Sequence, residues 1–290
     1  MFQHPTPLRA LGFCGIDDSV SPGLLSLISA QYPLVEWGVL FRPDLEGTPR
    51  YATMEWVKNK VSLRRHAEAP AESANVAQRS LWAFSFLFLT PSFKLHPAFL
   101  ATNGAMRLAA HLCGARVNEV LNGEDAFLQT LSSLGFKRVQ INATAVNGVD
   151  TTKLTDQVPV LADVIRRNPQ LEFIIQRSAE TSPLWEPLLT HNLANVSNLF
   201  DESKGTGTLL QEFVTPPTDV AVGYAGGLGP ANIAIVLPKI LAAAKGSSVW
   251  IDMESSLRST LNGADVFDVY KCYEVIEKTA ACGLMKMHTR

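Results

Sequence analysis

The stretch from residue 137 to residue 177 decides the fold. It begins with KRVQIN (Lys137–Asn142) and ends with EFIIQR (Glu172–Arg177), two short runs rich in β-branched and aromatic residues. Between them, Thr151–Arg167 has apolar residues at intervals of three and four, the spacing of a helix with one buried face. A strand, a helix and a second strand within roughly 30–40 residues form a βαβ unit, in which the two strands are parallel.

The same pattern repeats on both sides of this unit. Most of the strand-like runs are continuously apolar, as expected of strands that are buried on both faces of a parallel sheet. Eight such strands favour a closed (β/α)8 barrel over an open doubly wound sheet, and no Gly-x-Gly-x-x-Gly follows the first run. We therefore predict an α/β fold, a single TIM barrel over residues 1–290. The eight predicted strands are Arg9–Cys14, Glu36–Phe41, Met106–Leu112, Lys137–Asn142, Glu172–Arg177, Val196–Asp201, Asp219–Ala225 and Ser248–Met253.

The helix signals between the strands are of unequal strength. Ser21 and Pro22 indicate the start of a helix that runs to Gln31, since proline is favoured at the first helical position. Further helices are predicted over Asn118–Ser133, Pro230–Ala244 and Ala264–Ala281. The spacing between the second and third strands is too long for one helix, which predicts an insertion at about 67–104. Its apolar run Leu81–Leu89 suggests either a cover on the barrel exterior or a lid or homodimer contact.

Composition excludes several classes of protein. The chain has 290 residues, 47% of them hydrophobic and 18% charged, with a net charge of −2. Such a chain is not disordered, and it lacks the basic field of a nucleic-acid binder. The four cysteines are too scattered for a disulfide framework, and neither a signal peptide nor a membrane span is visible. We expect a cytoplasmic protein that acts on a small molecule, with no membrane or nucleic-acid partner.

Reactive groups of a TIM barrel lie at the C-terminal ends of its strands. Four motifs occur there in order: Phe13-Cys14-Gly15, Thr48-Pro49-Arg50-Tyr51, Asp201 before Gly205-Thr206-Gly207, and Ala225–Asn232, which reads AGGLGPAN. In these motifs the chain resembles the phosphoribosylanthranilate isomerases of tryptophan biosynthesis. It departs from them at Gly12, where the family has lysine, and at Asn142, where the family has histidine.

The resemblance implies an Amadori-type isomerisation of a phosphorylated aminosugar. Such a reaction needs a general acid at the ring oxygen and a general base at C2, on opposite sides of the substrate. By motif position, Cys14 is the base, Asp201 is the acid, and Arg50 binds the carboxylate of the anthranilate group. A thiol acts as a base only as thiolate, so this role requires a neighbour that lowers its pKa.

Phosphate binding is implied for the loops after the seventh and eighth strands. Gly226, Gly227 and Leu228 match the family, and the substrate-binding set is completed by Asp252, Ser255 and Ser256. Glu254 stands where the family has a small hydroxyl residue. If the eighth strand continues, Glu254 faces the barrel interior like Asp252 and repels the phosphate.

His111 is predicted to line the pocket. It shares a strand face with Cys113, but two ligands without an obvious third make a poor metal site, so we expect neither a metal nor a cofactor. Two alternatives to the isomerase remain. One is a TIM-barrel lyase or hydrolase that acts on an unphosphorylated substrate, with Asp17, His111, Asp201 and Glu254 converging on its pocket, either alone or around a divalent metal. The other is a catalytically silent homologue that binds a ligand.

Overall fold

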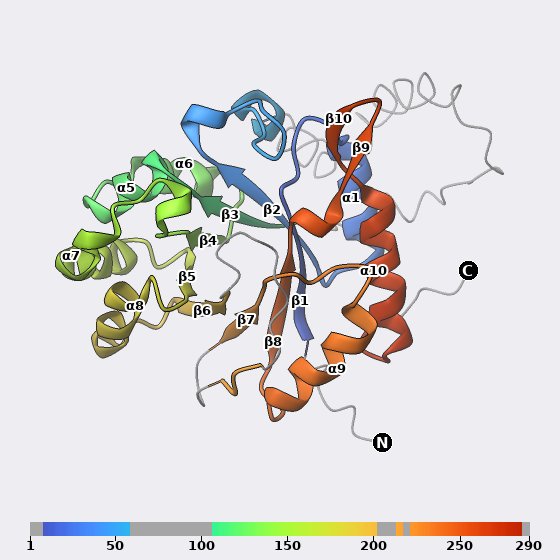
Figure 1. Ribbon diagram of the computed structural model, residues 1–290. Coiled ribbons are helices and arrows are strands. Elements are labelled where there is room, and N and C mark those ends of the chain that lie inside the picture. Colours follow the sequence, from blue (N-terminus) through green and yellow to red (C-terminus); the bar gives the residue numbers. More distant parts are fainter. Residues whose placement is uncertain (1–7, 59–105, 202–212, 217–220, 286–290) are drawn as a thin grey trace, which may run out of the picture.

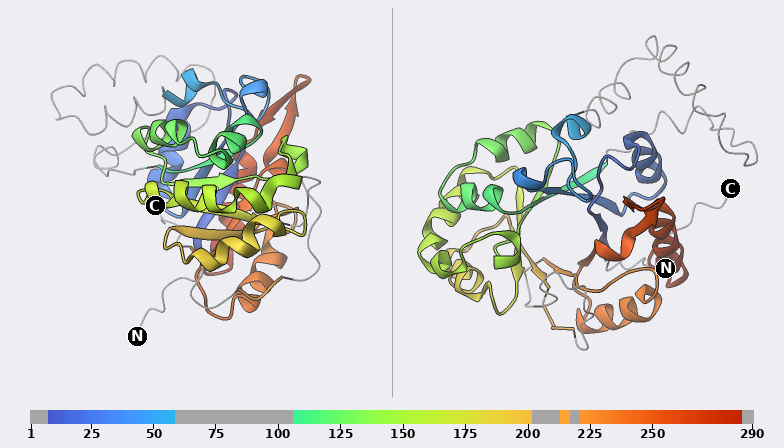
Figure 2. Two further views of the ribbon diagram at one scale, coloured as in Figure 1. Left: turned by 90° about the vertical axis from the view of Figure 1, so that its left-hand side faces the viewer. Right: turned by 45° about the horizontal axis from the view of Figure 1, so that its top comes forward.

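The computed structural model describes residues 8–58, 106–201, 213–216 and 221–285. Eight strands close into a parallel barrel in chain order, β1 pairing with both β2 and β8. Helices surround the strands, as the view toward the barrel end in Figure 2 shows. The strands are β1 Leu8–Cys14, β2 Val35–Phe41, β3 Arg107–Leu112, β4 Arg138–Ile141, β5 Glu172–Arg177, β6 Val196–Phe200, β7 Val222–Tyr224 and β8 Val249–Met253. The predicted TIM barrel is confirmed, and each predicted strand overlaps an observed one.

Most of the connecting helices pack one apolar face on the barrel (Figure 1). In α7, for example, Leu154, Val158, Leu161 and Ile165 are buried at helical spacing, and each buried side chain of this size contributes roughly 1.5–3 kcal/mol. The helices are α1 Pro22–Gln31, α5 Ala115–Leu121, α6 Ala126–Ser133, α7 Leu154–Arg167, α8 Ser182–Leu188, α9 Ile233–Ala243 and α10 Val269–Ala281. None of the helices in the described part of the chain is long and apolar enough to cross a membrane.

Three helix predictions need correction. The segment 118–133 forms two helices, α5 and α6, because the chain turns at Gly123, whose φ is +91°. Helix α9 begins at Ile233 and not at Pro230. The third is the N-terminal part of 264–281, which belongs to a hairpin of β9 Arg258–Leu261 and β10 Ala264–Phe267. Its turn is Asn262-Gly263, both with positive φ, a strong sequence signal for a tight hairpin.

The middle of the barrel is filled by a small apolar layer. Ala10, Ile174, Leu199, Ala225 and Trp250 come from or adjoin five strands and pack together inside the barrel. The large Trp250 fits because β7 has no side chain at Gly223, where an added Cβ would lie 2.1 Å from the indole. This layer separates two polar regions inside the barrel, which we call the floor and the mouth.

The floor, at the N-terminal end of the strands, is an ionic network. The Arg138 side chain is 4% exposed and forms an ion pair with Glu36, whose side chain is 6% exposed. Arg138 also lies 3.2 Å from Glu172, and its guanidinium covers the Trp250 ring at 4.1 Å. Arg9 pairs with Glu172 from the edge of this network. Buried charges are thus matched by opposite charges on other strands of the barrel, and these pairs cross its interior.

The predicted insertion at 67–104 and its apolar run Leu81–Leu89 lie outside the described residues. So does the Gly205-Thr206-Gly207 part of the sixth-strand motif.

Candidate active site

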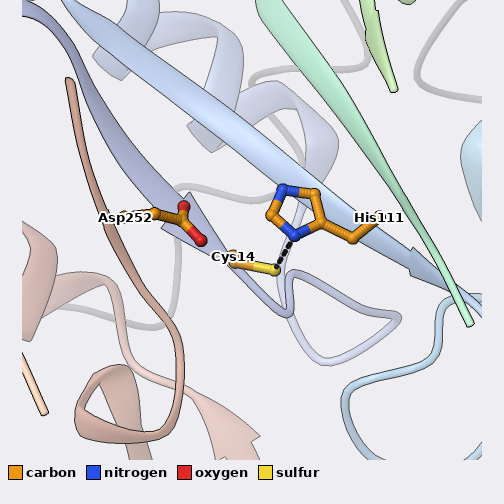
Figure 3. A group of neighbouring side chains, drawn as sticks. All are labelled: Cys14, His111 and Asp252. Atoms are coloured by element: carbon orange, nitrogen blue, oxygen red, sulfur yellow. Dashed lines mark hydrogen bonds between the residues drawn. The ribbon is translucent and has the colours of Figure 1, made fainter. Parts of the chain in front are cut away.

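Three side chains from distant parts of the sequence meet at the mouth, near the C-terminal ends of the strands. They are Cys14 from β1, His111 from β3 and Asp252 from β8 (Figure 3). The Sγ atom of Cys14 lies 3.2 Å from Nδ1 of His111. One sulfur, one nitrogen and one carboxylate oxygen of the three residues all lie within 4.8 Å of one another.

Two glycines make room for this cluster. A Cβ at Gly38 on β2 would lie 2.9 Å from the Cα and Cβ of Cys14, and one at Gly12 would lie 2.5 Å from the Asp252 carboxylate. Gly12 also approaches the backbone oxygen of Ile251 closely, so larger residues at either position would have to displace the cluster or the strands. The close approach of Asp252 and Ile251 therefore explains why this chain has glycine at position 12, where the phosphoribosylanthranilate isomerases have lysine.

Burial holds the cluster in its un-ionised form. It raises the pKa of Cys14 well above its usual value, and the neighbouring carboxyl groups of Asp252 and Glu254 raise it further. Burial, together with the charge of Arg138, lowers the pKa of His111 to about 3. Burial and the charges of Glu36 and Glu254 raise the pKa of Asp252. These shifts favour a protonated thiol, a protonated carboxyl group and a neutral imidazole.

This state differs from the activated thiolate that the base role of Cys14 requires. The nearest acceptor for its proton is Nδ1 of His111, and transfer between the two would give a thiolate–imidazolium pair.

Cys113 does not join the cluster. Its Sγ lies 3.4 Å from Nδ2 of Asn142, and Asn142 in turn accepts a hydrogen bond of 2.7 Å from Gln140. Burial raises the pKa of Cys113 to about 11. The His111 side chain thus contacts Cys14, whereas the thiol of Cys113 contacts Asn142 and, at 4.0 Å, the backbone carbonyl of His111.

Asp201 follows β6 at the same end of the barrel. Nε2 of Gln176 donates a hydrogen bond of 3.1 Å to its carboxylate. Asp201 also makes a minor contribution to the raised pKa of Asp252.

Arg50 is held at the rim by acidic groups. Its Nη1 lies 2.9 Å from Glu254 and 3.2 Å from Oγ of Ser255, and its Nε lies 3.5 Å from Asp265 on β10. The φ of Arg50 is +81°, an unusual value for a residue other than glycine, and its backbone N–H donates to Asp17. Strained backbone that is held by specific contacts is common at functional sites.

The argument from strand alternation does not apply to Glu254, although its carboxyl group lies close enough to Cys14 and Asp252 to raise the pKa of both. Strand β8 ends at Met253, and Glu254 has φ −137° and ψ −79°, so the alternation along the strand does not reach it. Its carboxylate is paired with Arg50, which reduces the repulsion that we expected between Glu254 and a phosphate.

Arg258 is the residue at the mouth whose role the sequence concealed. Its buried guanidinium donates to Asp17 at 2.8 Å, to the carbonyl of Gly15 at 2.8 Å and to Asp265 at 2.7 Å. It thereby ties the loop after β1 to the β9–β10 hairpin. The Asn262-Gly263 signal marks the hairpin, but nothing in the sequence shows which way Arg258 points.

The predicted phosphate loop has the backbone that its motif suggests. Gly226 and Gly227 both have positive φ, and no acceptor among the described residues meets the N–H groups of Gly226, Gly227 and Leu228. The hydroxyl of Ser256 donates to the carbonyl of Leu228 at 2.6 Å, which joins the loops after β7 and β8. The fold thus brings the predicted site residues to one end of the barrel, with Ser255 on the Arg50 side and Ser256 on the loop side.

No family model matches the chain, and no curated protein matches it either. Among solved structures, one titled "Native KDPGal structure" is similar over 97% of this chain and 99% of its own chain, with 10% identity and a TM-score of 0.43. A match of this quality carries no argument about reaction or substrate. The strand pairing itself defines the chain as a TIM-barrel protein.

Proposed function

We propose that the protein is an isomerase that moves protons on a phosphorylated aminosugar, as phosphoribosylanthranilate isomerases do. The observation that carries this proposal is the Cys14–His111 contact at the mouth, with two carboxyl groups, Asp252 and Asp201, at the same end of the barrel. General acid–base catalysis needs donors and acceptors of protons on either side of one substrate.

In the proposed mechanism Cys14 takes the proton from C2 of the substrate. Its own proton first moves to Nδ1 of His111, 3.2 Å away, which leaves a thiolate beside an imidazolium. Asp201 protonates the ring oxygen. Asp252 stabilises the amino group of the sugar while the ring opens. Proton transfer of this kind typically contributes roughly 10²–10⁴-fold to a rate.

The two ends of an anionic substrate have separate partners in this proposal. The free N–H groups of Gly226, Gly227 and Leu228 bind the phosphate, as backbone amides at the top of TIM barrels do. The planar guanidinium of Arg50 binds a carboxylate after Glu254 has moved aside.

The decisive experiment is turnover of phosphoribosylanthranilate by the purified protein. We expect isomerised product, and complementation of a tryptophan auxotroph that lacks the isomerase. An absence of turnover in a folded protein that nevertheless binds inorganic phosphate would replace the isomerase with a silent ligand-binding homologue.

A second candidate has one observation in its favour. Glu254 and Asp265 already occupy the polar atoms of Arg50, which suits a lyase or hydrolase whose substrate lacks a carboxylate and a phosphate. If neither the parent protein nor Glu254→Gln binds inorganic phosphate, this candidate is favoured over the isomerase.

A further inference from the structure

We infer that the cluster of Cys14, His111 and Asp252 binds a Zn²⁺ ion. The three donors come from β1, β3 and β8, and their ligand atoms lie within 4.8 Å of one another (Figure 3). In the described part of the chain it is the one group of three or more His, Cys, Asp or Glu side chains with donor atoms this close. This inference concerns metal binding alone. A zinc ion would occupy the same Cys14 and His111 side chains that the proposed isomerase uses to move a proton, so zinc binding and that proton transfer exclude each other.

The types of ligand atom in this cluster are those that zinc binds in proteins. Zinc binds thiolate sulfur at about 2.3 Å, imidazole nitrogen at about 2.0–2.1 Å and carboxylate oxygen at about 2.0–2.2 Å, usually with tetrahedral geometry. Two such ligands of one ion are roughly 3.5 Å apart. The contact of 3.2 Å between Cys14 and His111 is close to this value, and the limit of 4.8 Å leaves only a small side-chain adjustment for Asp252.

The sulfur and nitrogen donors exclude harder ions. Magnesium and calcium prefer sites made only of oxygen atoms, whereas a thiol and an imidazole select zinc and its neighbours among the transition metals. Three protein ligands leave the fourth tetrahedral position for a water molecule or an anion, which is the arrangement of catalytic zinc sites.

The position of the cluster also favours binding. Cys14 and His111 are buried on barrel strands, and the absence of a Cβ at Gly12 and Gly38 lets the carboxylate and the sulfur lie close against the neighbouring strands. Nearby acids are engaged elsewhere, because Asp17 is bound by Arg258 and Glu254 by Arg50. Cys113, the neighbouring thiol, contacts Asn142 and serves as an internal comparison.

The test is a titration of the full-length protein with Co²⁺, whose visible spectrum reports tetrahedral thiolate ligation, followed by displacement with Zn²⁺. We expect one equivalent to bind with a sulfur-to-cobalt charge-transfer band. Cys14→Ser and His111→Ala should each weaken binding more than about 100-fold, beyond the 10–100-fold losses typical of residues that only orient a ligand. Cys113→Ser should bind like the parent protein.

Thermal melting of each variant, measured without metal, separates loss of binding from loss of fold. If His111→Ala unfolds, the more conservative His111→Asn and Asp252→Asn take its place. The inference is overturned if the parent protein binds no stoichiometric cobalt, or if Cys14→Ser binds it as tightly as the parent. Loss of the band in Cys113→Ser but not in Cys14→Ser would also overturn it. A protein that binds zinc but does not turn over phosphoribosylanthranilate would support this inference and contradict the proposed function.

Discussion

Both the floor and the mouth of the barrel contain buried polar groups, but the two regions differ in whether those groups are ionised. At the floor, Arg138 keeps its charge beside Glu36 and Glu172. At the mouth, Cys14 and His111 are buried and Asp252 is half-buried, with no cation among the three, and their pKa shifts favour the un-ionised forms. Charged pairs therefore hold strands together at the floor. At the mouth, the residues of the cluster remain un-ionised at the place where a ligand could bind.

The rim of the mouth lies between these extremes. Arg50 and Arg258 are charged and paired with Asp17, Glu254 and Asp265, and the pair of Arg258 and Asp17 is buried. These contacts join three loops around the un-ionised cluster.

The largest effect is expected at the floor. Arg138→Ala leaves the buried Glu36 with only the more distant Arg107, 3.9 Å away, and breaking a buried pair on one side typically costs about 3–5 kcal/mol. Urea unfolding should show this loss in the free energy of unfolding. The matched control is Arg167→Ala, which removes an exposed pair with Asp125 and should cost less than about 1 kcal/mol. Equal losses in the two variants would mean that the floor is not a stabilising network.

At the mouth, the expected effect is on activity rather than stability. Under the proposed function, Cys14→Ala should lower turnover of phosphoribosylanthranilate by about 10² or more, because it removes the general base. Cys113→Ala removes a thiol at the same end of the barrel and should keep turnover within a few-fold. Circular dichroism checks that both variants fold. Full activity in Cys14→Ala would make Cys14 a packing residue.

A smaller effect is expected at the rim, and it depends on pH. Burial works to raise the pKa of Asp17, but hydrogen bonds from Ser19, the Arg50 N–H and Arg258 outweigh it and lower the pKa below 3.8. A carboxyl group with a lowered pKa in the folded state stabilises the fold above its unfolded pKa. That contribution is lost as the pH falls through the folded value.

Acid unfolding of Asp17→Asn tests this expectation. At neutral pH the variant should lose about 1.5–3 kcal/mol, the usual contribution of hydrogen bonds to a charged group. Its stability should then fall less steeply than that of the parent below about pH 4, where the unfolded carboxyl group takes up its proton. Parallel curves for the two proteins would show that Asp17 titrates normally in the folded state.

The fold was accessible from the sequence because strands buried on both faces are continuously apolar. Runs such as Glu172–Arg177 therefore stand out from the amphipathic helices between them. The break at Gly123 and the hairpin turn at Asn262-Gly263 carry recognisable local signals, and both were hidden within longer stretches that have helical periodicity.

The site could be predicted from the sequence only in part. Cys14, His111 and Asp252 could each be placed at a strand end, but their convergence depends on barrel closure and on the space left by Gly12 and Gly38. The direction of Glu254 depends on where β8 stops, a matter of one residue. Long-range contacts of this kind have no local sequence signal.

The central claim is that the cluster of Cys14, His111 and Asp252 stays un-ionised until a ligand binds, and the ionisation of Cys14 tests it most directly. The measurement is the ultraviolet absorbance of thiolate as a function of pH, taken as the difference between the parent protein and Cys14→Ala. An ordinary cysteine ionises with a pKa of about 8.5. Because burial and the carboxyl groups of Asp252 and Glu254 raise the pKa of Cys14, we predict no difference signal from this thiol up to about pH 9. A thiolate signal from Cys14 at neutral pH in the empty protein would contradict the account.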